Sequence, residues 1–257
     1  MNKLAKIAVV VAGLALVAQV AKANDFDIIL GFNGNGATSD YVINLGNANT
    51  SVGVGSGQVT DLSSFFNATT FNSIFTAGVN GTLMGAGGGQ NATSPTLYYT
   101  ENRGAAGNAS SALSLAPTLT STSFAKNGAG NFNDLPNTFS GLNSTGGNLT
   151  VASSDPDSWS SQITSGNPGS FTSNTGLNSP SSAIGSGVIY EDLWQATKSG
   201  NKMVWTYTGY LTFDDTGSSP SLTFSAVPVP EPSTYGLFGA AGVLVLALRR
   251  RFSHKNA

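Results

Sequence analysis

The chain has 257 residues, no cysteine, one histidine and a formal net charge of −2. The lack of cysteine excludes disulfides and thiol chemistry, and the only histidine, His254, lies near the C-terminus, so residues 24–227 cannot supply a Ser-His-Asp triad or a histidine-ligated zinc site. Those residues hold twelve acidic and four basic side chains, which disfavours a nucleic-acid partner because no basic patch could neutralise phosphate.

The N-terminus has the pattern of a secretory signal peptide. Lys3 and Lys6 form a basic start, residues 7–20 are mostly apolar, and Ala21-Lys22-Ala23 is an A-x-A sequence. The apolar run is too short for a transmembrane helix and a cleavage sequence follows it. We therefore expect residues 1–23 to be removed after Ala21 and Ala23 are recognised, so that an exported domain begins at Asn24.

Residues 25–104 read as strands with short helical turns between them. Alternating apolar residues predict a hairpin over residues 25–46, with the turn at Asn33-Gly-Asn-Gly. Residues 60–66 and 70–75 predict two helical turns, with Thr60 and Thr70 as N-caps. Residues 82–84 and 96–100 predict strands joined by a glycine-rich loop over residues 85–94, which lacks the context of a phosphate-binding loop.

Residues 105–182 are rich in Ser, Thr, Asn and Gly and poor in large apolar side chains. Burying so few apolar side chains compensates only poorly for the conformational entropy that is lost when the chain becomes ordered. We expect a low-complexity, loop-rich insertion, with one short helix capped by Asp155 and Pro156 as its first residue. A fully disordered segment remains open as the alternative. The expected anchors are aromatic: Phe124, Phe132, Phe139, Trp159 and Phe171.

From residue 187 the strand pattern returns. Residues 203–213 alternate well, and Gly209 shifts the phase, which predicts a bulge. Residues 214–220 predict a turn and residues 221–227 a return strand. Scarce helix and no strand-helix-strand spacing together predict a mainly β fold, an antiparallel sandwich or jelly-roll-like body over residues 24–227.

The candidate chemistry of this body is limited to carboxylates, amides and aromatic rings. Acidic residues occur close together at Asp25/Asp27, Asp155/Asp157, Glu191/Asp192 and Asp214/Asp215. Neighbouring residues on a strand face opposite sides of a sheet, so Glu191/Asp192 and Asp214/Asp215 are poor catalytic pairs, and turn or cap roles are favoured. We expect no catalytic, cofactor-binding or metal-binding residue.

Two further sites stay open. Calcium could bind at residues 33–40, through Asp40 and its neighbours, or at residues 155–157, although ordinary turns are the favoured reading. The late strands carry aromatic residues that belong to the core or, if they face outward, could stack on sugar rings. These residues are Trp194, Trp205, Tyr207 and Tyr210.

The C-terminal segment, residues 228–257, has three parts in a fixed order. Pro230-Glu231-Pro232 is held extended by its prolines, residues 235–248 carry no charge and are apolar or small, and Arg249, Arg250 and Arg251 follow. The charge-free run ending in arginines predicts a transmembrane helix over residues 235–248 with its C-terminal end in the cytoplasm. Residues 233–248 span only about 24 Å as a helix, against a core of roughly 30 Å, which suits a transient anchor.

This arrangement resembles the PEP-CTERM sorting signal of exported bacterial proteins. The resemblance implies recognition by an exosortase, a membrane-embedded cysteine protease-transpeptidase that cuts near the Pro-Glu-Pro motif. It further implies transient insertion in the inner membrane with the body outside the cytoplasm, and then delivery to the cell surface or extracellular matrix, as in a biofilm. It says little about residues 24–227.

For that body we expect a non-catalytic structural or adhesive role, with an extracellular polysaccharide as one open partner. Two alternatives remain. One is a carbohydrate-binding module with outward-facing aromatic residues. The other is a carbohydrate-active enzyme that uses two carboxyl groups roughly 5–9 Å apart in one cleft.

Overall fold

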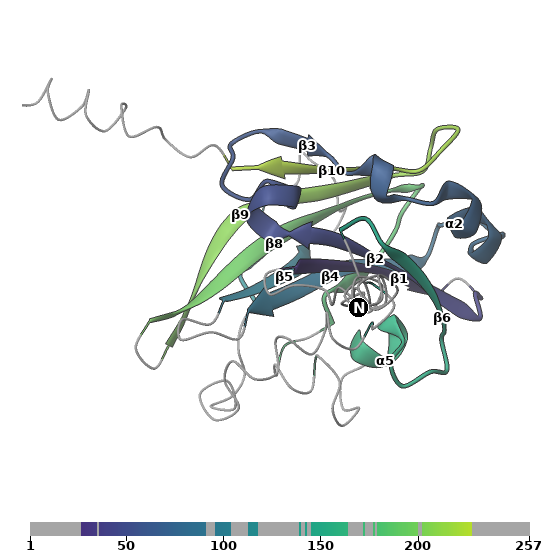
Figure 1. Cartoon of the computed structure of the whole chain (residues 1–257), viewed down its shortest axis with the longest axis horizontal. Helices are drawn as coiled ribbons and strands as arrows, with labels where there is room; N and C mark the ends of the chain where they lie inside the picture. Colours follow the sequence, from purple (N-terminus) through teal and green to yellow (C-terminus); the bar gives the residue numbers. More distant parts are fainter. Residues whose placement is uncertain are drawn as a thin grey trace, which may run out of the picture.

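The computed structural model describes residues 27–34, 36–90, 96–103, 113–117, 139, 142, 145–163, 172, 177, 179–199 and 202–227 (Figure 1). The expected signal peptide, the sorting segment and the anchors Phe124, Phe132 and Phe171 lie outside these residues. The described part forms one antiparallel sheet. Its strands are β1 (Asp27–Gly34), β2 (Ser39–Asn47), β3 (Val59–Asp61), β4 (Thr82–Gln90), β5 (Thr96–Asn102), β6 (Asn148–Ala152), β7 (Ser181–Ala183), β8 (Val188–Ser199), β9 (Lys202–Asp214) and β10 (Ser221–Ala226).

The strand order across the sheet is β3-β10-β9-β8-β5-β4-β1-β2-β6, and β7 pairs with β4 beside the end of β5. Every pairing is antiparallel, and the hairpins β1–β2, β8–β9 and β9–β10 join neighbours in sequence. The structure also has four short helices: η3 (Ala48–Val52), η4 (Ser63–Phe65), α2 (Ala68–Ile74) and α5 (Trp159–Ile163), the last of which packs on β1 and β2. The prediction of a mainly β, antiparallel fold is confirmed.

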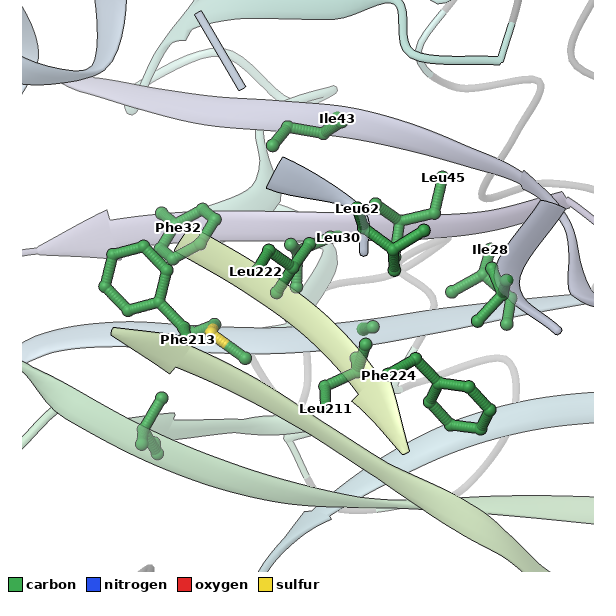
Figure 2. Close-up of a cluster of buried hydrophobic side chains, with 14 of the residues drawn as sticks. Ile28, Leu30, Phe32, Ile43, Leu45, Leu62, Leu211, Phe213, Leu222 and Phe224 are labelled. Atoms are coloured by element: carbon green, nitrogen blue, oxygen red, sulfur yellow. The ribbon is translucent and has the colours of Figure 1, made fainter. Parts of the chain in front are cut away.

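The sheet curls, so that its two ends pack against each other. The rings of Phe32 in β1 and Phe213 in β9 lie 5.1 Å apart between centroids, although three strands separate β1 from β9. Figure 2 shows Leu30 and Phe32 facing Leu222 and Phe213 across this interior. One curled sheet thus encloses a core much as two packed sheets do in a sandwich.

The inner core is apolar and fully enclosed. Alternate residues of β1 point into it, and β2, β9 and β10 contribute in the same way. Burying each such Leu, Ile or Phe side chain contributes about 1.5–3 kcal/mol. Phe71 of α2 belongs to this core, and the half-buried Phe65, Phe66 and Ile74 pack against it.

A second core lies on the outer face of the sheet. Trp159 of α5 is fully buried there against Ile29, Val42 and Leu97, together with Phe139. In Figure 1, α5 lies on the far side of the β1–β2 hairpin from β3 and β10. The described parts of the Ser/Thr/Asn/Gly-rich segment therefore supply a layer of core, including the expected anchors Phe139 and Trp159.

The predicted glycine-rich loop is wrong, because Gly85 to Gly89 lie within β4. The glycines are needed where other backbone passes close by. A Cβ at Gly85 would overlap the carbonyl of Pro180, and a Cβ at Gly88 would overlap that of Asp27. Close backbone approach, rather than a turn, explains this run.

The predicted helix caps are also wrong. Thr60 belongs to β3, and α2 begins after Asn67, whose Oδ1 accepts a hydrogen bond from the Thr70 N–H. The helix expected from Pro156 begins at Trp159, where Ser158 Oγ accepts from the Ser161 N–H. Asp155 instead closes a turn by accepting from the Asp157 N–H.

The predicted bulge beside Gly209 is confirmed. Leu193 pairs with Gly209 but Trp194 pairs with Tyr207, so Thr208 is the extra residue in β9. The Thr208 hydroxyl donates to the Leu193 carbonyl at 2.8 Å, which stabilises the bulge. The bulge changes which residues of β9 share a face, and this positions the cluster described next.

Candidate binding surface and sorting signal

A polar and aromatic cluster lies on the outer face of β5, β8 and β9. We call it the Arg103 cluster: Arg103, Asp192, Trp194, Tyr207 and Tyr210. Asp192 and Trp194 share a face of β8 because they are two residues apart. Tyr210 pairs with Asp192 and Tyr207 pairs with Trp194, so both tyrosines reach that face. Residues three apart on a regular strand would face opposite sides, and the bulge at Thr208 removes this difference.

Arg103 follows β5 and forms the centre of the cluster. Its Nε donates to Asp192 Oδ1 at 2.7 Å, in an ion pair that is almost wholly buried on both sides. Its Nη2 donates to the Tyr207 hydroxyl, and its guanidinium carbon lies 4.0 Å from the centre of the Tyr210 ring. Hydrogen bonds and a cation–π contact together offset the cost of burying the two charges.

A separate segment completes the hydrogen bonding of this cluster. The Ser114 N–H donates to Asp192 Oδ2 at 2.7 Å, and Trp194 Nε1 donates to Ser114 Oγ at 2.9 Å. Ser114 lies in residues 113–117, where Leu113 and Leu115 are 51% and 90% exposed. Both oxygens of Asp192 therefore have partners, one of them supplied by a segment that contributes little apolar burial.

The aromatic residues of this face are half-buried. The rings of Trp194 and Tyr207 lie 5.5 Å apart between centroids, and those of Tyr190 and Tyr210 lie 6.2 Å apart. Burial, and then the charge of Asp192, raise the pKa of Tyr207, so its hydroxyl stays protonated at neutral pH. The sequence left open whether four aromatic residues belong to the core or face outward. All four are intermediate in exposure: Trp194, Trp205, Tyr207 and Tyr210.

Glu191 faces the opposite side from Asp192, as the alternation of the strand predicted. It has no exposed surface, and neither carboxylate oxygen accepts a hydrogen bond of normal geometry from the described residues. Burial raises its pKa well above the ordinary value, the nearby Ser182 hydroxyl partly opposes this rise, and Glu101 adds to it. Burial likewise raises the pKa of Glu101 to about 7. The carboxyl of Glu191 is therefore enclosed within the sheet and does not reach its surface.

Three other acidic residues, Asp27, Asp40 and Asp214, accept hydrogen bonds from backbone N–H groups or nearby side chains. Asp214 Oδ1 accepts from both the N–H and the hydroxyl of Thr216, in the predicted turn. Asp27 accepts from Asn44 Nδ2 at 2.9 Å, while Asp25 lies outside the described residues. Asp40 accepts from Ser153 and Ser160.

Calcium binding at residues 33–40 stays a prediction. Asn35 lies outside the described residues. Across the described ranges, no group of three or more His, Cys, Asp or Glu side chains is placed to hold a metal ion. Asp40 Oδ1 accepts from the Ser153 and Ser160 hydroxyls, and Asp40 Oδ2 accepts from the Ser160 N–H, so both carboxylate oxygens already have partners.

Comparison with known proteins identifies the C-terminal segment. Residues 228–251 match the family model described as the PEP-CTERM protein-sorting motif. No curated protein and no solved structure matches the chain. The chain is thus a protein that carries this sorting motif, and the match includes Pro230, Glu231, Pro232 and Arg249 to Arg251. The motif implies export, recognition by a membrane exosortase and transient anchoring in the membrane.

Several predicted features of the two ends lie outside the described residues. These are the signal cleavage at Ala21 and Ala23 and the helix over residues 235–248. Where the structure describes the chain, no helix is long and apolar enough to cross a membrane.

Sequence reasoning missed Arg103 and Ser114. Arg103 is one of four basic residues in an acidic body and directly follows an aromatic strand, which was an available signal. Ser114 gave none, because it is one of many serines in a low-complexity segment. Its partners Asp192 and Trp194 lie about 80 residues away in the sequence.

Proposed function

We propose that residues 24–227 form a structural or adhesive domain displayed at the cell surface or in the extracellular matrix, including biofilm matrix. The observation that carries this proposal is a curled sheet packed on both faces, joined directly to a sorting motif. Such a body stands on its core without disulfides, which suits a stable exposed domain.

We also propose that the body is not an enzyme. Glu191 is enclosed, and Asp192 is held through Oδ1 by Arg103 in an almost wholly buried ion pair. Acid–base cleavage of a glycosidic bond needs two carboxyl groups that reach the substrate. Residues 24–227 contain no histidine or cysteine to take their place.

A second candidate function is polysaccharide binding at the Arg103 cluster. The half-buried rings of Trp194, Tyr207 and Tyr210 have apolar faces. Beside them lie an acceptor, Asp192 Oδ2, and a donor, Trp194 Nε1, which Ser114 contacts in this structure. Sugar recognition uses this combination of apolar faces and few, well-placed polar groups.

Fractionation of cells that produce the tagged protein tests the structural proposal. We expect the body in the surface or matrix fraction. We also expect the matrix of cells that lack the gene to disperse more easily than that of cells that have it. A purified protein that depolymerises a polysaccharide, measured as new reducing ends, would contradict the non-catalytic role. A body confined to the membrane or periplasm would contradict its location.

A further inference from the structure

We propose that Ser114 occupies the Arg103 cluster as a stand-in for a polysaccharide hydroxyl, so that residues 113–117 regulate binding by covering the site. We call residues 113–117 the Ser114 strap. This inference rests on the second proposed function, polysaccharide binding at the Arg103 cluster, and identifies the groups that contact the ligand: the Asp192 carboxylate, the Trp194 indole N–H and the adjoining rings.

The hydrogen-bonding pattern of Ser114 carries the inference. Ser114 gives one donor, its N–H, to Asp192 Oδ2, and one acceptor, its Oγ, to Trp194 Nε1. A sugar hydroxyl also combines one donor with acceptor lone pairs. A hydroxyl placed between these two groups would therefore satisfy both of them, and leaving either unpaired would be costly.

The rest of the cluster is organised without the strap. Arg103 holds Asp192 through Oδ1, which leaves Oδ2 directed toward Ser114. Arg103 is in turn fixed by the Tyr207 hydroxyl and the Tyr210 ring. The acceptor, the donor and the ring of Trp194 thus keep their positions when Ser114 leaves, as a pre-organised binding site requires.

The strap itself is weakly held by apolar contacts. Leu113 and Leu115 are 51% and 90% exposed, and Ala116 is exposed as well, so Ser114 provides its polar attachment. Pro117, in contrast, is buried. A ligand that supplies the same two hydrogen bonds together with stacking on the rings can displace such a segment, and its affinity is lowered by the fraction of molecules in which the strap is closed.

The test compares neutral polysaccharide binding by the full chain and its variants, using affinity electrophoresis in mild detergent through gels that contain dextran, laminarin or hydroxyethyl cellulose. Ser114→Pro removes the N–H donor and the hydroxyl. We expect this variant to bind at least one of the three polysaccharides about tenfold more tightly than the native chain. Leu115→Ala, an exposed position in the same strap, serves as the control and should bind like the native chain. Adding Trp194→Ala to Ser114→Pro should abolish retardation.

A second measurement does not depend on how the variants fold. Hydrogen exchange of the native chain should become faster in peptides that cover residues 113–117 when the bound polysaccharide is added. Equal binding by the native and Ser114→Pro chains, with no change in exchange, would overturn the stand-in role and leave polysaccharide binding intact. Retardation of neither chain by any of the three polysaccharides would count against both the binding function and this inference.

Discussion

Gly31 of β1 provides the space in which Trp159, a central residue of the outer core, is packed. A Cβ at this position would overlap the Trp159 ring, which packs directly on the glycine backbone. Trp159 is fully buried there, and its Nε1 donates to Ser181 Oγ at 3.1 Å. Because Gly31 has no side chain, β1 leaves room for the Trp159 ring of α5 to pack against its backbone.

We predict that Gly31→Ala destabilises the protein by about 2 kcal/mol or more, because the Trp159 ring must leave its site or strain its neighbours. The measurement is the urea midpoint of unfolding, followed by tryptophan fluorescence. Gly185→Ala is the matched control: a Cβ there meets nothing within 4 Å, so the midpoint should change little. Equal midpoints for the two variants would contradict the packing of Trp159 on Gly31.

The buried carboxyl groups predict a dependence of stability on pH. Burial raises the pKa of Glu101 from 4.5 to about 7, and that of Glu191 well above 4.5. The folded state therefore holds protons that the unfolded chain has already released. For Glu101 this stabilising contribution is complete below about pH 4.5 and is lost as the pH rises through about 7; Glu191, whose pKa is also raised, contributes in the same direction.

We predict that Glu101→Gln makes the fall in stability between pH 5 and pH 7.5 shallower than in the native chain. This variant removes one titrating group and also a charge that adds to the effect of burial in raising the pKa of Glu191. Urea unfolding at a series of pH values provides the measurement. The exposed Asp157→Asn serves as the control and should keep the native slope. An unchanged slope for Glu101→Gln would argue against this coupling.

At the level of elements, the strands could be predicted and the ends of the helices could not. Alternation and turn residues located β1, β2, β9, β10 and the bulge, because these signals act over a few neighbouring residues. The glycine run in β4 was misread as a loop, since its reason is the approach of Asp27 and Pro180 from elsewhere in the chain. Long-range contacts likewise determined β6, which pairs with β2 across about a hundred residues.

The candidate site was predictable only in part. Trp194, Tyr207 and Tyr210 and the adjacent bulge were recognised from the sequence, whereas Arg103 and Ser114 depend on tertiary pairing. The alternation of side chains along a strand correctly predicted that Glu191 and Asp192 lie on opposite faces of the sheet. The sequence did not indicate that both are buried, because burial of a carboxyl depends on what covers it.

The cap of α2 gives a direct test at this scale. Asn67 Oδ1 accepts from the Thr70 N–H, so Asn67→Ala should destabilise the protein by about 1 kcal/mol. Thr70→Ala keeps that N–H and should cost less than about 0.5 kcal/mol. Urea midpoints of the two variants provide the comparison. The reverse order would show that Thr70, as the sequence suggested, is the capping residue.

For the whole molecule, the junction between sheet and sorting motif is short. β10 ends at Ala226, the Val227 N–H donates to the Thr208 carbonyl, and the motif match begins at residue 228. A cut near Pro230-Glu231-Pro232 would therefore remove the sorting segment and leave every described strand in place. The body needs no refolding after such processing.

In the sorting segment we expect the Pro-Glu-Pro motif to determine cleavage and the three arginines to determine membrane topology. We predict that Glu231→Gln stops processing but leaves the protein membrane-bound, because the arginines still fix its topology. Replacing Arg249, Arg250 and Arg251 with Ser should instead let unprocessed protein pass into the exported compartment. Fractionation with an antibody to the body tests both variants. Normal release of Glu231→Gln, or unchanged retention of the triple variant, would contradict the corresponding half.

The claim that the protein is exported and sorted by an exosortase is tested most directly by mass spectrometry of the form released from cells. We predict that the released form has its N-terminus near Asn24, after removal of residues 1–23, and its C-terminus near residues 230–233. We also predict that the released form retains all of β10. A released form with an intact peptide containing Arg249, Arg250 and Arg251 would contradict the account.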